Sequence, residues 1–148
     1  MKHAILFLIL LFVCKVLFAP EHRSALIEYG KKIDPYKRVI EAISWVESRR
    51  NDNSINWTEF AYGRYQIRKI RLQDYWERTG IRYTLTDMLD SAKAERVIKY
   101  YASSFGPYNT EGFILDWNCR SREYLRKVKK SITNQQIELW QRKLKNKH

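Results

Sequence analysis

The sequence stretch that decides the fold is Tyr36–Ser48, YKRVIEAISWVES. In an α-helix each residue turns about 100° from the one before it. One arc about 120° wide then collects the apolar side chains of Tyr36, Val39, Ile40, Ile43 and Val46. Glu47 falls inside this arc, whereas Glu41 and Ser44 fall on the opposite, solvent-facing side. The spacing therefore predicts an amphipathic helix that carries one acid on its core-facing stripe.

The position of Glu47 on the core-facing side of the predicted helix requires an explanation. A carboxylate on an apolar stripe must find a hydrogen-bond partner, hold a proton or line a cleft, because burying an unpaired charge is costly. We take the third option as the hypothesis, which makes Glu47 a candidate catalytic acid. The alternative is a solvated side chain at a helix end that turns outward. At the other end, Asp34 can cap the helix, with Pro35 at its first position.

The N-terminal residues form a separate segment of the chain. Met1–Ala19 holds an apolar run of signal-peptide length, interrupted by Lys15 and followed by Pro20. We expect residues 1–19 to be a signal peptide or an N-terminal membrane anchor. Residues 20–148 then form one domain, which we expect to be exported to the periplasm or cell envelope.

The net charge indicates which classes of partner the protein could bind, and the cysteine content shows whether a disulfide could stabilise the domain. The net charge is +12 for the whole chain and +10 without the first 19 residues. A basic surface favours polyanions such as nucleic acid, anionic lipid or the carboxylates of a cell wall, although it can also be merely a solvated face. Of the two cysteines, Cys14 lies in the leader, so no disulfide can staple the domain. We expect Cys119 to be a free, packed thiol.

The rest of the sequence predicts a mainly α-helical single domain. No stretch alternates as a strand does, and Asn51–Thr58 is interpreted as a loop. Expected helices run from Lys69 to about Arg78 before Gly80, and from a cap at Asp90 to Gly106. Three shorter helices are expected to begin near Thr110, at Ser121, and at a Thr133–Gln136 capping box, the last carrying Ile137, Trp140 and Leu144.

A set of motifs then occurs in a recognisable order. Glu47-Ser48 precedes an A-x-G-x-x-Q-I segment at Ala61–Ile67, a helix with Tyr100-Tyr101, and the pair Trp117-Asn118. This order resembles that of the soluble lytic transglycosylases and goose-type lysozymes, which share the lysozyme-like fold. The resemblance covers about Tyr36 to Val128.

The resemblance implies a role for each matched residue. Glu47 corresponds to the single essential acid, and Ser48 would orient the end of the catalytic helix. The substrate-binding residues would be Ser48, Gly63, Tyr65, Gln66, Tyr101 (or Tyr100), Trp117 and Asn118. Because an indole has no phenolic hydroxyl, a phenol that contacts Glu47 would have to come from a residue other than Trp117. Aromatic side chains such as Tyr101 and Trp117 can equally belong to the core.

The family's chemistry agrees with the pattern at Glu47. Glycosidic bond cleavage needs an acid whose pKa is raised, and an apolar setting raises it by disfavouring the anion. The resemblance implies cleavage of the MurNAc-β-1,4-GlcNAc bond of peptidoglycan to a 1,6-anhydro product, with the substrate's N-acetyl group in place of a second carboxylate. Asp52 and Glu59 are the nearby acids that could fill that second role.

Two other functions remain open. The same bond could be hydrolysed, as lysozymes do. The chain could instead be a non-catalytic basic helical module that binds glycan, anionic lipid or nucleic acid, although nucleic acid is not expected for an exported protein. No cluster of His, Cys and Asp has metal-ligand spacing and no glycine-rich phosphate loop occurs, so we expect no metal or cofactor. We expect a monomer.

Overall fold

The computed structural model describes residues 34–146, apart from the side chain at position 144. All the elements below lie in the second of the two units into which the chain divides, Pro35–His148. In order they are α3 (Lys37–Ser48), β1 (Ile55–Asn56), β2 (Ala61–Tyr62), β3 (Ile67–Arg68), α4 (Lys69–Thr79), the short 3₁₀ helix η1 (Thr86–Leu89), α5 (Ser91–Phe105), α6 (Thr110–Trp117) and α7 (Arg122–Lys145). The expected mainly helical fold is confirmed. Residues 1–19, the expected leader, lie outside the described range.

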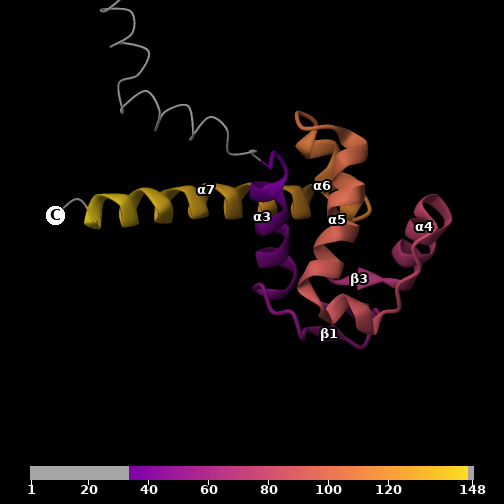
Figure 1. Ribbon diagram of the computed structural model, residues 1–148. Coiled ribbons are helices and arrows are strands. Elements are labelled where there is room, and N and C mark those ends of the chain that lie inside the picture. Colours follow the sequence, from indigo (N-terminus) through magenta and orange to yellow (C-terminus); the bar gives the residue numbers. More distant parts are fainter. Residues whose placement is uncertain (1–33, 147–148) are drawn as a thin grey trace, which may run out of the picture. The chain divides into compact units, whose positions relative to one another are not determined.

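The core is built around α3, as its sequence pattern predicts. Val39, Ile40 and Ile43 are almost fully buried, and α3 packs chiefly against α7. Figure 1 shows α3 crossing α7. The C-terminal end of α7 extends to the left of α3 in this view, and α5 and α6 lie to the right of α3. Side chains from α5, α6 and α7 complete the same core, among them Val97, Ile98, Phe113, Ile114 and Val128.

A small antiparallel sheet follows α3, where the sequence predicts only loop. β2 pairs with β1 on one side and with β3 on the other, each strand being two residues long. The prediction failed here because two residues are too few for an alternating pattern to be visible. Gly63 lies between β2 and β3 with φ 74°, which only glycine adopts without strain.

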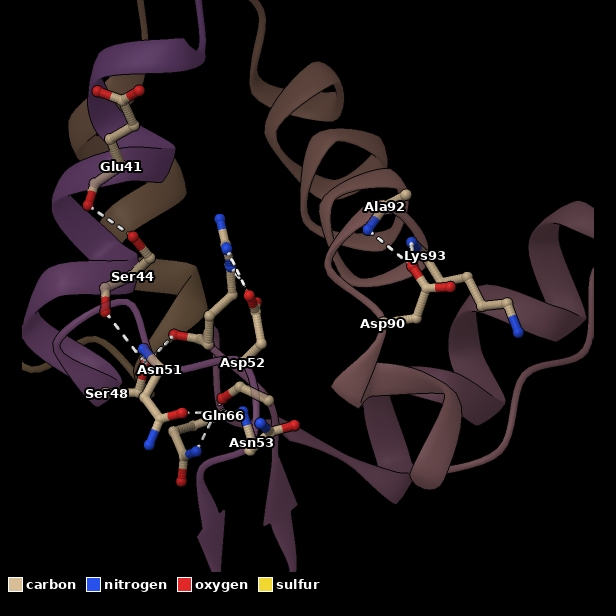
Figure 2. A network of polar contacts seen from close by, with 12 residues as sticks. Glu41, Ser44, Ser48, Asn51, Asp52, Asn53, Gln66, Asp90, Ala92 and Lys93 are labelled. Carbon is tan, nitrogen blue, oxygen red and sulfur yellow. Dashed lines mark hydrogen bonds and ion pairs between the residues drawn. The ribbon is translucent and has the colours of Figure 1, made fainter.

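Helix boundaries agree with the sequence in some places and not in others. Gly80 and Gly106 end α4 and α5, and the Asp90 carboxylate caps α5 by accepting from the N–H groups of Ala92 and Lys93 (Figure 2). The predicted cap of α3 is wrong: Tyr36 holds the N-cap position, and Pro35 precedes the helix. Likewise Asn109, and not Thr110, caps α6 through its side chain.

The largest correction concerns the C-terminal end of the chain. The helices predicted at Ser121 and Thr133 form one continuous helix, α7, of 24 residues. The predicted capping box fails because Thr133 donates its hydroxyl to the carbonyl of Lys129 within an unbroken helix. Ser44, expected on the solvent side of α3, is also buried, with its hydroxyl donated to the Glu41 carbonyl. None of the helices in residues 34–146 is long and apolar enough to span a bilayer.

Candidate active site

Glu47 is held by a tyrosine from the far end of the sequence. It lies in the last turn of α3, half-buried, and its Oε1 accepts a hydrogen bond of 2.6 Å from the Tyr124 hydroxyl. Tyr124 belongs to the first turn of α7 and is only 7% exposed. The contact α3 makes with α7 thus brings together two residues that are 77 positions apart. Tyr124 supplies the phenolic donor that Trp117 could not.

Burial changes the acid strength of both partners. The pKa of Glu47 is raised above its ordinary value, chiefly because burial disfavours the carboxylate, and the negative charge of Glu59 adds to this effect. The hydrogen bond from Tyr124 and the positive charge of Arg68 act in the opposite direction. Burial and the neighbouring Glu47 raise the pKa of Tyr124, so its phenol stays protonated and remains a donor. Glu47 is therefore an acid that keeps its proton at higher pH than an exposed glutamate.

A cleft of about 680 Å³ opens beside Glu47. The residues that line it include five that the sequence singles out, namely Glu47, Gln66, Tyr101, Trp117 and Asn118. They come from α3, the β2–β3 turn, α5 and the end of α6, so no single sequence segment could have predicted their proximity. A cleft of this size is in the usual range for small-ligand sites.

One wall of the cleft is a stack of a guanidinium on two aromatic rings. The Arg71 guanidinium carbon lies 4.8 Å from the centre of the Tyr101 ring and 5.1 Å from that of Trp117. Arg71 also donates to Asp116, to Oδ2 at 2.9 Å and to the carbonyl at 2.5 Å. The Tyr101 hydroxyl lies 2.7 Å from Asp74 Oδ2. These contacts fix α4 against α5 and α6, and they make the wall rigid before any ligand arrives.

The end of α3 and the β2–β3 turn also contribute to the cleft, through Glu47 and Gln66. The Ser48 hydroxyl donates to the Arg64 carbonyl at 2.9 Å and accepts from the Asn51 N–H at 3.1 Å. The Gln66 amide donates to the Gly63 carbonyl at 2.8 Å and to the Ser54 carbonyl at 3.3 Å. Figure 2 shows Ser48, Asn51 and Gln66 gathered below the end of α3. Ser48 therefore ties the helix that carries Glu47 to the segment that carries Gln66.

Three of the expected substrate-binding residues do not line this cleft. Tyr65 is 2% exposed and belongs to the core, so the structure places it in packing and not in a groove. Gly63 lies against η1, where a Cβ would stand 1.9 Å from the Met88 carbonyl oxygen. Ser48 holds the backbone as described above. Gly63 and Tyr65 belong to the β2–β3 turn that also carries Gln66, and Ser48 is bonded to that turn at Arg64.

The two nearby acids have different surroundings. Asp52 forms a two-pronged ion pair with Arg64, at 2.5 and 2.8 Å, and is not among the cleft residues. Glu59 does line the cleft, on the turn between β1 and β2, and its carboxylate lies 3.9 Å from Arg68. Of the two, only Glu59 shares the cleft with Glu47.

Cys119, in the loop after α6, was expected to be a packed thiol, and this expectation is wrong. The thiol is free and exposed, and it lines the cleft where a packed position was expected. Cys119 and Arg120 both have positive φ, 44° and 62°, because the chain reverses sharply between α6 and α7. Asn118 is the C-cap of α6, as its place in the sequence allows. Within residues 34–146 no group of three His, Cys, Asp or Glu residues could hold a metal ion.

Comparison with known proteins adds no relative. No protein-family model matches the chain, and neither the curated proteins nor the solved structures contain a significant match to it. The assignment of function therefore depends on the site itself and on the order of its motifs.

Proposed function

We propose that the chain is a lytic transglycosylase of lysozyme-like fold that cleaves the MurNAc-β-1,4-GlcNAc bond of peptidoglycan. The observation that carries the proposal is the half-buried Glu47, with a raised pKa, at the wall of a sugar-sized cleft. The resemblance in motif order supports it independently, because the residue it matches to the catalytic acid is the same Glu47. The substrate would be the glycan strand, and the protein would act as an exported monomer in the periplasm or cell envelope, without a cofactor.

The first chemical step would use Glu47 as an acid. As the bond between the anomeric carbon and the bridging oxygen breaks, Glu47 donates its proton to that oxygen, and the sugar approaches an oxocarbenium ion. Tyr124 donates to Oε1, so Oε2 is the oxygen that can carry the transferable proton. The raised pKa lets Glu47 hold that proton to a higher pH than an exposed glutamate does.

The second step would use the same residue as a base. The N-acetyl group of the substrate stabilises the positive anomeric carbon, and Glu47, now a carboxylate, removes the proton of the 6-hydroxyl. That oxygen bonds to the anomeric carbon and closes the 1,6-anhydro ring, and Glu47 recovers its proton. The Tyr124 hydrogen bond stabilises the carboxylate between the two steps.

The cleft offers groups suited to a glycan. Gln66 and Asn118 carry amides, which can both donate to and accept from hydroxyl and N-acetyl groups. The Tyr101 and Trp117 rings are themselves buried, each 6% exposed, and the Arg71 guanidinium lies against both, so their part in the cleft is to support Arg71.

Hydrolysis of the same bond is the second candidate, and Glu59 is the observation that favours it. Glu59 lies in the cleft with Glu47, where a second carboxylate could activate a water molecule. In the transglycosylase reaction Glu59 has no chemical role. Substitution of Glu59 therefore separates the two reactions.

The test is analysis of muropeptide products by mass spectrometry after incubation with purified peptidoglycan. We expect anhydro ends from the parent protein, no product from Glu47→Gln, and the same anhydro products from Glu59→Gln. Reducing ends that disappear in Glu59→Gln would instead establish hydrolysis. Undiminished cleavage by Glu47→Gln would overturn both candidates, and no cleavage by the parent would indicate a glycan-binding module.

A further inference from the structure

The C-terminal half of α7 extends beyond the core. The first half of the helix contributes Tyr124, Val128 and Ser131 to the buried interior. From Thr133 to Asn146, every side chain that the structure describes is exposed except that of Gln135, which is half-buried. Figure 1 shows these turns continuing past α3, with no other labelled element beside them. The domain itself therefore gives this half of the helix little packing.

Large apolar side chains nevertheless occur on it. Ile137 is 50% exposed, Leu139 57% and Trp140 70%. Leu139 follows Val128 by eleven residues and so lies on the same side of the helix as Val128. Ile137 follows Val128 by nine residues, which is two and a half helical turns, so the two side chains point in opposite directions. Trp140 follows Ile137 by three residues and lies on the same side of the helix. We call these two residues the apolar stripe; it faces away from the core that α7 completes.

The same helix is strongly basic. Between Arg122 and Lys145 it carries eight basic and two acidic side chains. Arg142, Lys143 and Lys145 follow Trp140 within five residues, and all three are exposed. An aliphatic and tryptophan stripe beside lysine and arginine is the composition of helices that lie in the plane of a membrane interface. Each basic residue near an anionic surface strengthens the attraction about fivefold.

We propose that residues 133–146 of α7 dock on an anionic lipid bilayer, with the apolar stripe among the upper acyl chains and the basic side chains at the headgroups. A soluble polyanion would satisfy the charges but would leave the stripe in water. A second copy of the chain could cover the stripe, but it would bring like charges together. The proposal is independent of the glycosidase activity, because none of these residues lines the cleft.

Hydrogen exchange measured by mass spectrometry tests this on the full-length chain, because it reads α7 separately from any lipid binding through residues 1–19. On vesicles of phosphatidylglycerol and phosphatidylcholine, amides in residues 137–146 should exchange at least about tenfold more slowly than in buffer. On vesicles of phosphatidylcholine alone they should not slow down. Equal rates in buffer and on the anionic vesicles would overturn the proposal, and so would equal protection on the two kinds of vesicle.

Two variants separate the contributions of stripe and charge. The double variant Ile137→Gln with Trp140→Gln, and the triple variant Arg142→Gln, Lys143→Gln, Lys145→Gln, should each lose the protection on anionic vesicles. Trp57→Gln is the matched control, since Trp57 is similarly exposed, at 67%, but lies next to β1. Protection that persists in the double variant would exclude docking through the stripe. Protection by soluble polyphosphate, or protection that grows with protein concentration without lipid, would identify a polyanion or a second copy as the true occupant.

Discussion

Removal of a single oxygen atom tests how Glu47 is held. Tyr124→Phe keeps the ring that packs between α7 and α3 and deletes the hydroxyl that donates to Glu47 Oε1 at 2.6 Å. Since Tyr124 is 7% exposed, water cannot easily take the place of the lost donor. The effect of the substitution should therefore come almost entirely from the hydrogen bond.

The size of the effect depends on the charge of Glu47. A hydrogen bond to a charged group contributes about 1.5–3 kcal/mol, and one between neutral groups about 0.5–1.5 kcal/mol. For a domain of this size, 1 kcal/mol shifts Tm by about 4 °C. We expect Tyr124→Phe to lower Tm by about 2–6 °C at pH 4, below the ordinary pKa of a glutamate, and by more, up to about 6–12 °C, at pH 8, where a larger share of Glu47 is charged. The loss of the donor also raises the pKa of Glu47 further, so the alkaline limb of the activity profile should move to higher pH.

Thermal unfolding followed by circular dichroism at both pH values measures this difference. Tyr83→Phe is the control, because the Tyr83 hydroxyl accepts from Arg96 at 3.1 Å and has no contact with Glu47. Its effect on Tm should be equal at pH 4 and pH 8. If Tyr124→Phe also lowered Tm equally at both values, the hydroxyl would not be bonded to a titrating carboxylate, and the reasoning would be refuted.

Three further substitutions have predictable effects on stability. Because folding raises the pKa of Glu47, stability is lost as the pH rises from the ordinary glutamate pKa through that raised value, so Glu47→Gln should raise Tm at pH 8 and leave it unchanged at pH 4. Gly63→Ala should lower the free energy of unfolding by at least about 2 kcal/mol, because φ is positive and the Cβ would meet the Met88 carbonyl. Asp90→Ala should cost about 1 kcal/mol through loss of the α5 cap.

The Gly63 and Asp90 substitutions each have a matched control variant in the same urea or thermal unfolding experiment. Gly80→Ala has a similar φ of 73° but open space around the new Cβ, so it should cost only about 1 kcal/mol. A cost equal to that of Gly63→Ala would argue against the contact with Met88. Asp90→Asn keeps a capping oxygen and should be close to neutral. A lower Tm for Glu47→Gln at pH 8 would contradict the raised pKa.

The sequence pattern predicts helices best where they are periodic and bounded. Amphipathic spacing identifies α3 and α5, and Gly80 and Gly106 mark true helix ends because few other residues adopt their backbone conformation readily. The two-residue strands escape prediction because they are too short to alternate. The false break in α7 has a different cause: Thr133 and Gln136 form a capping signature, but a helix already packed on α3 continues through it.

The candidate site, too, was predictable from the sequence only in part. The apolar arc of Tyr36–Ser48 was enough to single out Glu47, since helical geometry fixes which side of α3 an acid faces. It could not identify Tyr124 as the partner of Glu47. Nor could it predict that Tyr65 packs in the core, or that Glu59 and Cys119 line the cleft. All of these placements depend on contacts between distant segments of the chain. The sequence by itself thus determined the helices and the acid within one of them. Only the tertiary structure decided the partners and the cleft, because burial and proximity are properties of packing and not of local order.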